Sequence, residues 1–417
     1  MISVPKCLSS LLSAVGYGRH FYVTFTVFPQ SSIFILIDLL CSNPFGFHNP
    51  FLQWAFPLFS AFLGCGTDNF FTLIAFTKKF HIVFYPFFCY NNRQKRTSVF
   101  DREGWISMPI VVVGNVFVDI KGFPDNKYIP SGRNSGRVET VHGGVGRNVA
   151  EDIANIELRP RFVSMVDDTP QGEEVINQLA RHKVDTRYVV SAPDGMGQWL
   201  AVFDSDGEIA ASISKRPSME PMAKLLEEKG DEIFADADSI VVEIDMDKDI
   251  IKLVFQFAHK YHKPVYAVVA NMSIATQRRD FFQSIDCFVC NEQEAGLLFV
   301  EDYSDFSPIE LCEAISQKVM DARIPSMIVT MGSEGAVYAD MHGGKGLCPA
   351  KYVEVQDTTG AGDAFCAGAA AGLTYGKTMQ ESVQIGTTLA ASVLSMTENV
   401  CPRFLPSELG LDVVLPE

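Results

Sequence analysis

The sequence predicts an α/β fold for residues 108–417, in which helices cover both faces of a parallel sheet. Two observations predict it. Short apolar runs such as "PIVVVGNVFVDI" (109–120) and "SMIVTMG" (326–332) are typical of strands that are buried on both faces. Amphipathic segments of helical length lie between such runs, for example "DKDIIKLVFQFAHKYH" (247–262). Because strands alternate with helices, a three-layer α/β/α domain is expected.

The same pattern predicts the other main elements of this domain. Apolar runs at residues 239–246, 263–270 and 285–290 are expected strands, and residues 307–322 are an expected helix.

One region departs from this alternation. Residues 121–141 and 187–214 resemble strands joined by tight turns, and Asp206-Gly207 is a hairpin signal. They predict a small β-element beside the α/β body. Over a site in such a body, this element would serve as a lid that excludes water when a substrate is bound.

Residues 1–107 differ in composition from the rest of the chain. They carry a net charge of +4, whereas the remainder carries −20, and they hold 18 of the 32 phenylalanines. Asp38, Gln53 and Pro57 interrupt the apolar runs, so none reaches the roughly 18 uninterrupted apolar residues typical of a membrane span. Three interpretations stay open: a membrane-associated segment, an accessory domain, or a non-native extension. The third is favoured because "MPIVVVGNVFVDI" begins at Met108 like a new N-terminus.

Charge and cysteine usage limit the functional classes. The formal net charge of −16 argues against nucleic-acid binding through a basic surface. Ten cysteines are scattered along the chain, and Cys287 and Cys290 form the one close pair. No second pair at ligand spacing accompanies them, so they are expected to be ordinary core thiols. This usage suits a reducing, cytoplasmic location.

The stretch "DTTGAGDAFCAG" (357–368) is the strongest candidate for chemistry. A glycine loop that opens a helix presents backbone N–H groups to an anion, and Gly360 and Gly362 would allow a phosphoryl oxygen to approach closely. Asp363 falls in the first helical turn. An aspartate there is also what plain capping predicts, so this loop alone leaves a functional and a structural interpretation open.

Four other stretches add polar residues at the ends of expected strands or at helix starts. Each of them also has a plain interpretation as a cap or a turn. They are "VVGNVFVDI" with Asn115 and Asp119, "HGGVGRNVAEDIANI" with Arg147 and Asn148, "CNEQEAG" with Asn291 and Glu294, and "VTMGSEGAVY" with Gly332 and Gly335.

In this order and over residues 108–417, the motifs resemble the ribokinase-like (PfkB) family of carbohydrate and nucleoside kinases. "DTTGAGDAF" and the "GGVGRN" loop match the two signatures of that family. The resemblance implies a central sheet with flanking helices, a small β-lid, and transfer of the γ-phosphoryl group of ATP to a hydroxymethyl group.

The resemblance also implies a role for each matching residue. Asp363 is implied as the catalytic base that takes the proton of the attacking hydroxyl, and the backbone amides of Gly360, Ala361 and Gly362 as the anion hole. The other matching positions fall into groups: substrate binding by Asp119, Gly143, Gly144 and Asn148; nucleotide binding by Thr330, Gly332 and Gly335; Mg²⁺, through water or phosphate, at Asn291 and Glu294; and a monovalent cation such as K⁺ at Asp357 and Thr359. Asn115, at the end of the first strand, and Arg147, in the second glycine loop, are further substrate-binding candidates.

"GGVGRN" and the lid hairpin "WLAVFDSDGEIAASI" resemble the pseudouridine kinases, with Arg147 as the distinguishing residue. Conversion of pseudouridine to pseudouridine 5′-phosphate is therefore the expected reaction. Ribose, fructose-type sugars and other nucleosides remain alternatives, as do a catalytically silent ligand-binding protein and a membrane-tethered kinase. Exposed edge strands of a lid also predict a homodimer with lids meeting.

Two positions depart from the pattern of the family. Ala270-Asn271 stands where many members have Asp-Pro, and Asp167 stands where glycine is common. Nothing in residues 1–107 resembles the family.

Overall fold

The computed structural model describes residues 109–413 in full and, before them, the backbone of five short strands. The chain divides into two units, residues 1–97 and 98–417. In the first unit, β1 (Val15–Gly16) pairs with β2 (Arg19–His20), and a separate sheet has the order β3-β4-β5. The members of that sheet are Val23–Val27, Ile33–Asp38 and Phe71–Phe76. The three interpretations of residues 1–107 concern a region that lies mostly outside the described residues.

Within residues 109–413, the large sheet has nine strands in the order β10-β9-β6-β13-β14-β15-β16-β17-β18. The first seven in that order are parallel, and β17 and β18 follow as antiparallel neighbours. The strands are β6 (Ile110–Val113), β9 (Arg161–Asp167), β10 (Asp185–Ala192), β13 (Ser239–Glu243), β14 (Val265–Val268), β15 (Cys287–Asn291), β16 (Ser326–Thr330), β17 (Ala336–Asp340) and β18 (Lys345–Cys348).

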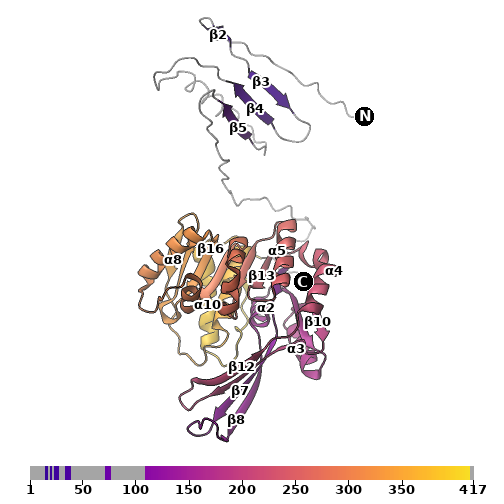
Figure 1. Cartoon of the computed structure of the whole chain (residues 1–417), viewed down its shortest axis with the longest axis vertical. Coiled ribbons are helices and arrows are strands. Elements are labelled where there is room, and N and C mark those ends of the chain that lie inside the picture. The colour runs from indigo at the N-terminus through magenta and orange to yellow at the C-terminus, as the bar shows by residue number, and fades with distance from the viewer. Residues whose placement is uncertain are drawn as a thin grey trace. The chain divides into compact units, whose positions relative to one another are not determined.

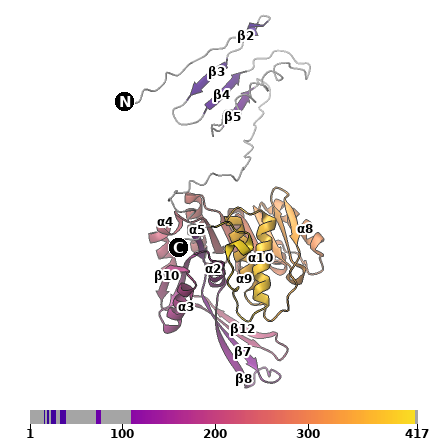
Figure 2. The same ribbon diagram turned by 180° about the vertical axis from the view of Figure 1, so that it is seen from behind.

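Helices cover both faces of this sheet (Figures 1 and 2). Successive residues of β6 point to opposite faces: Val111 and Val113 join one apolar core, and Ile110 and Val112 join the other. The first core is closed by α4 (Glu220–Phe234), α5 (Lys248–Tyr261) and α8 (Pro308–Ala322). The second is closed by α2 (Val145–Asn155), α3 (Pro170–Arg181), α9 (Ala361–Thr374) and α10 (Met379–Leu394). The expected three-layer α/β fold is confirmed.

Two short α-helices follow β14 and β15 along the chain. They are α6 (Met272–Ala275) and α7 (Glu292–Phe299), and α7 begins directly where β15 ends.

A second sheet forms the small β-element, with the order β12-β11-β7-β8. It projects from one edge of the α/β body in both views (Figures 1 and 2). Its strands are β7 (Phe117–Pro124), β8 (Gly136–Gly143), β11 (Gly197–Phe203) and β12 (Ile209–Lys215). Gly207 has a φ of 86° in the turn between β11 and β12, which is why this hairpin needs a glycine there.

Two expected boundaries were wrong. Residues 185–192 form β10 and pair with β9 at the edge of the large sheet, so the small sheet does not contain residues 187–192. The run 109–120 is not one strand, because β6 ends at Val113 and β7 begins at Phe117. Gly114 marks the break: a Cβ there would lie 2.5 Å from the Cα of Gly146. The chain leaves the large sheet at this contact and enters the lid.

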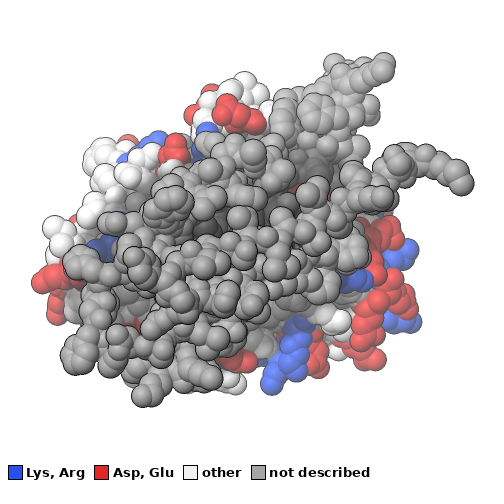
Figure 3. Space-filling view, turned by 90° about the horizontal axis from the view of Figure 1, so that it is seen from above, with Lys and Arg blue, Asp and Glu red and all other residues white. Residues whose placement is uncertain are grey.

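Three expectations from the composition concern the surface charges, the cysteines and membrane-spanning helices. On the face seen in Figure 3, described Lys and Arg side chains lie beside Asp and Glu side chains. Cys287 and Cys290 are buried and unpaired, which confirms that they are core thiols. Among the described residues, no helix combines the length and the apolar character that a membrane crossing requires.

Candidate active site

The glycine loop ends in a helix whose start carries no side-chain cap. Gly360 is the N-cap residue of α9, with a φ of 83°, and no side chain bonds to the first turn. A Cβ at Gly360 would lie 2.0 Å from the carbonyl oxygen of Asn399, so only glycine fits. At Gly362 the opposite holds, because a Cβ there would meet no atom within 4 Å. The positive end of the helix dipole therefore opens onto unfilled space, as an anion site requires.

Asp363 lies in this first turn, but it does not cap the helix. Its carboxylate accepts a hydrogen bond from Asn148 Nδ2 at 2.7 Å. The pKa of Asp363 is raised to about 7, chiefly by burial. The bond from Asn148 and the charge of Arg147 act to lower this pKa, and the nearby Glu294 and Asp119 carboxylates act to raise it. A carboxylate with such a pKa is suited to accept a proton near neutral pH.

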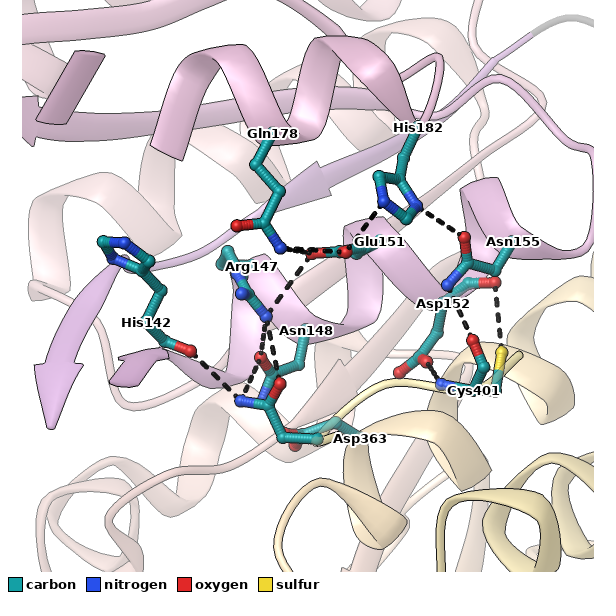
Figure 4. Close-up of polar contacts among 11 residues, drawn as sticks. His142, Arg147, Asn148, Glu151, Asp152, Asn155, Gln178, His182, Asp363 and Cys401 are labelled. Carbon is teal, nitrogen blue, oxygen red and sulfur yellow. Dashed lines mark hydrogen bonds and ion pairs between the residues drawn. The ribbon is translucent and has the colours of Figure 1, made fainter. Parts of the chain in front are cut away.

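Arg147 and Asn148 come from the second glycine loop, at the start of α2 (Figure 4). Arg147 is only 3% exposed, and its Nη1 donates to Asn148 Oδ1 at 2.7 Å. The same nitrogen lies 3.4 Å from Glu151 Oε2 and 3.4 Å from Asn399 Oδ1. Arg147 was expected to bind the substrate, whereas the structure directs its guanidinium to other protein side chains.

Asp119 lies on β7 with its carboxylate over the backbone of Gly143, where a Cβ would come within 2.5 Å of Oδ2. Burial raises the pKa of Asp119 above its usual value, and Lys121 and Arg147 offset part of this effect. Gly144 has a φ of 103°. Together, Asp119 and the backbone of Gly143 and Gly144 form a polar rim between the lid and Asp363.

Asn115 does not offer its amide group to a substrate. Its Nδ2 donates to Glu243 Oε1 at 2.8 Å and its backbone N–H to Glu243 Oε2 at 2.9 Å, and its side chain is buried. Burial and the neighbouring Asp245 raise the pKa of Glu243 to about 7. Asn115 thus serves to fasten the β6–β7 turn to the end of β13.

Asn291 and Glu294 form a reciprocal capping box at the start of α7. Asn291 Oδ1 accepts from the Glu294 backbone N–H, and Glu294 Oε2 accepts from the Asn291 backbone N–H, both at 2.8 Å. Burial raises the pKa of Glu294, and this carboxylate in turn raises that of Asp363. Among the described residues, no three His, Cys, Asp or Glu side chains are grouped as a metal site. A Mg²⁺ carried by phosphates needs only one or two carboxylates, which Glu294 fits.

Thr330, Gly332 and Gly335 lie together at the turn between β16 and β17. Gly332 has a φ of 52° and a Cβ there would meet nothing within 4 Å. Gly335 has a φ of 98°, and a Cβ there would lie 2.1 Å from the Cys348 carbonyl oxygen. Gly332 therefore leaves open space at the turn, while Gly335 closes it against β18.

Asp357 and Thr359 shape the loop before α9. Asp357 Oδ1 accepts the Thr359 backbone N–H at 2.8 Å. Burial acts to raise the pKa of Asp357, but hydrogen bonds from Thr359 outweigh it, and this pKa is held below its usual value. The loop therefore keeps an ionised carboxylate close to Gly360.

Three residues of this network escaped sequence reasoning. Asn399 donates through Nδ2 to the His142 carbonyl oxygen at 3.1 Å, and its own carbonyl lies against Gly360. Glu151 and Glu243 are each 1% exposed. No motif points to Asn399. The pairing of Glu151 with Arg147 could have been predicted, because Glu151 stands four residues after Arg147 on the same helix face.

Comparison with solved structures identifies the class of fold. The structure aligns with ribokinase of Arabidopsis thaliana, solved as a complex with ribose and ATP, at a TM-score of 0.63 and 22% identity over 74% of this chain and 100% of the other. It also aligns with adenosine kinase of Sinorhizobium meliloti at a TM-score of 0.58 and 21% identity, over 70% of this chain and 96% of the other. These likenesses confirm the ribokinase-like fold.

The chain belongs to the pfkB family of carbohydrate kinases, whose model matches residues 109–399. Guanosine-inosine kinase of Exiguobacterium acetylicum is 34% identical over 298 residues, which cover 70% of this chain and 95% of the relative. Pseudouridine kinase of Escherichia coli is 23% identical over 288 residues, covering 69% and 90%. The protein is thus an ATP-using phosphotransferase with an alcohol group as acceptor, which confirms the expected enzyme class.

Proposed function

We propose that this enzyme phosphorylates the 5′-hydroxyl of a nucleoside, with guanosine and inosine as the first candidate acceptors. The observation that carries the proposal is Asp363, whose carboxylate is held by Asn148 at the open start of α9 with a pKa of about 7. The choice of acceptor is supported by the 34% identity to a guanosine-inosine kinase over nearly its whole length.

In the proposed reaction, the acceptor hydroxyl attacks the γ-phosphorus of ATP while Asp363 accepts the hydroxyl proton. The oxygen–phosphorus bond to ADP breaks, and ADP leaves with that bonding electron pair. Backbone N–H groups of Gly360, Ala361 and Gly362 would stabilise the charge on the transferring phosphoryl oxygens. Thr330, Gly332 and Gly335 would bind the nucleotide.

Asp119, Gly143 and Gly144 would hold the sugar of the acceptor. Asn148, which uses one amide hydrogen on Asp363, would offer it the second. Trp199 on β11 lies directly opposite Asp119 on β7, so both side chains share the inner face of the lid. Its partly exposed indole offers a flat apolar surface of the kind on which nucleobases stack. This placement favours a nucleoside over a free sugar.

Pseudouridine is the second candidate acceptor. Its support is the "GGVGRN" loop with Arg147 and the 23% identity to a pseudouridine kinase. The guanidinium of Arg147 is bonded to Asn148 and paired with Glu151. The "GGVGRN" motif is therefore weaker support for pseudouridine as the acceptor than the sequence alone indicates.

Bound Mg²⁺ would neutralise charge on the ATP phosphates, and Glu294, with Asn291 beside it, is the proposed partner of its hydration shell. Asp357 and Thr359 are the proposed neighbours of a monovalent cation such as K⁺. The buried free thiols favour a reducing compartment such as the cytoplasm.

A homodimer through the lid is also proposed. Ile120, Leu200 and Ile213 lie opposite one another on β7, β11 and β12, on the face turned away from Asp119. Leu200 and Ile213 are exposed, and so is Val138 on β8. Covering such a face with a second copy would remove apolar area from water.

The test is an ATP-consumption screen of the full chain with guanosine, inosine, pseudouridine, uridine, adenosine, ribose and fructose. We expect the highest kcat/KM for guanosine or inosine, and a Trp199→Ala variant that loses kcat/KM for nucleosides while ribose is unaffected. A preference for ribose or fructose would overturn the nucleoside assignment. No turnover with any acceptor would instead favour a catalytically silent binding protein.

The proposed dimer is tested by the mass of the full chain in solution. A monomer mass would contradict it.

A further inference from the structure

Arg147 is buried beside the proposed base, although it has no direct bond to Asp363. Its Nη1 donates to Asn148 Oδ1 at 2.7 Å, and Asn148 Nδ2 donates to Asp363 Oδ2 at 2.7 Å (Figure 4). Arg147 therefore reaches the carboxylate through one intervening amide.

The hydrogen-bond donors of the Arg147 guanidinium set which way that amide points. A guanidinium only donates hydrogen bonds, so it can face only the oxygen of the Asn148 amide. Asn399 Nδ2, also a donor, lies 3.4 Å from the same oxygen. The amide nitrogen of Asn148 is then left for Asp363, whose Oδ2 must accept. Without Arg147, the amide could turn and present its oxygen to the carboxylate, which would repel it.

Arg147 is itself anchored from the opposite side. Glu151 Oε2 lies 3.4 Å from Nη1, one turn further along α2, and both side chains are buried. Gln178 Nε2 donates to Glu151 Oε1 at 3.2 Å, and His182 Nε2 lies 3.5 Å from the same oxygen. Glu151 is thus held by the end of α3 and the residue that follows it, so the guanidinium has little freedom to move.

We propose that Arg147 is a positioning residue that acts through Asn148 to fix the orientation of the Asp363 carboxylate. This inference rests on the proposed role of Asp363 as the base. Supporting it, the positive charge of Arg147 lowers the pKa of Asp363 and opposes the effects of burial, Glu294 and Asp119. Arg147 thereby holds the pKa of the proposed base down toward neutral pH as well as aligning its carboxylate.

The kinetic test compares the wild-type chain with the double variant Arg147→Met/Glu151→Gln, which leaves no unpaired buried charge. We expect kcat to fall by about 10²-fold with little change in KM for the acceptor, because misalignment of a reacting group affects the chemical step. We also expect the acid limb of the pH profile to move to higher pH. Arg279→Met, which removes an exposed arginine outside this network, is the control and should match the wild type.

A raised KM with unchanged kcat would show that Arg147 contacts the substrate, and would overturn the proposal. In the double variant, where the positive charge is removed, a lower kcat with an unmoved acid limb would reduce Arg147 to a packing role and overturn the proposal as well. Should the double variant not fold, Arg147→Lys decides: the lysine keeps the charge but not the planar fork, so kcat should fall while the acid limb stays near that of the wild type. Wild-type kcat in Arg147→Lys would refute positioning by the guanidinium.

A second readout needs no turnover, so it separates this proposal from the proposed function. The melting temperature of each chain is followed against pH, with and without Asp363→Asn. Because the folded pKa of Asp363 is raised, its favourable contribution is present at acid pH and is lost as pH rises through about 7. In the Arg147→Met/Glu151→Gln background this loss should continue to higher pH, because the folded pKa of Asp363 rises when the positive charge is removed. Loss at the same pH in both backgrounds would overturn the electrostatic part, whatever the acceptor screen finds.

Discussion

The starts of α7 and α9 lie close enough for the Glu294 carboxylate to raise the pKa of Asp363, yet they are built in opposite ways. At α7, the Asn291 side chain accepts the N–H of Glu294 and the Glu294 side chain accepts the N–H of Asn291, which makes a complete capping box. At α9, Gly360 provides no side chain, and Asp363 is turned to Asn148 instead of its own helix. A helix start that its own residues leave uncapped is one that a ligand can complete.

The largest expected effect comes from removing the proposed base, Asp363, at the open helix start. Asp363→Asn should lower kcat by about 10²- to 10⁴-fold, since a positioned general base contributes that much. The variant should also fold at least as stably as the wild type at pH 8, because the ionised carboxylate is disfavoured by burial there. Steady-state kinetics and thermal melting check both halves, and retained turnover would remove Asp363 from the mechanism.

The pH dependence of the reaction should report the same group. Asp363 must lose its proton before it can act, and its pKa is about 7. We therefore expect kcat/KM to rise tenfold per pH unit below about pH 7 and to level off above it. The profile of Asp363→Asn, measured on its residual activity, should lack this limb. A wild-type profile that is flat between pH 5 and pH 8 would speak against a base with this pKa.

Filling the open space at α9 should affect activity without affecting the fold. In Gly362→Ala the new methyl group meets no protein atom within 4 Å, so we expect normal melting. It would occupy the region proposed for the transferring phosphoryl group, and we expect kcat/KM to fall at least about tenfold. Gly360→Ala is the contrasting variant: its methyl group would lie 2.0 Å from the Asn399 carbonyl oxygen, so it should lower the melting temperature. Full activity of Gly362→Ala would contradict the anion site.

The smallest expected effect lies at the closed helix start. Asn291→Ala removes a cap and should lower the free energy of unfolding by about 1 kcal/mol, seen as a few degrees in melting temperature. Ser307→Ala removes the corresponding cap of α8, where the capping box is of the same kind, and should cost a similar amount. Only Asn291→Ala should also raise the Mg²⁺ concentration needed for half-maximal activity. An equal Mg²⁺ requirement in both variants would leave Asn291 with a purely structural role.

Much of the fold was predictable because its signals are local. Buried strands and amphipathic helices have distinct periods, and the expected helix at 307–322 differs from α8 by one residue. The membership of strands in sheets was less predictable, because it depends on distant partners. Residues 185–192 have the pattern of any exposed or edge strand, and their pairing with β9 is set by the crossover through α3.

The site divides in the same way. Asp363 and the open loop were found from a local motif, whereas the partner of Asn115 is Glu243, 128 positions away. Arg147 likewise faces Glu151, which Gln178 in α3 and His182 directly after it hold in place. Sequence identifies residues with the right chemistry, but it does not tell whether a side chain faces a ligand or another side chain.

The hydrogen bond between Asn148 and Asp363 joins residues 215 positions apart, and Asn399 adds a contact from near the end of the chain. During synthesis the lid and α2 emerge long before α9 and Asn399. The proposed sugar-binding rim therefore leaves the ribosome first, and the proposed catalytic carboxylate follows with a later segment of the chain. A chain that stops before Asn399 would lack the hydrogen bond of that residue to Asn148, so the network around the proposed base would be incomplete.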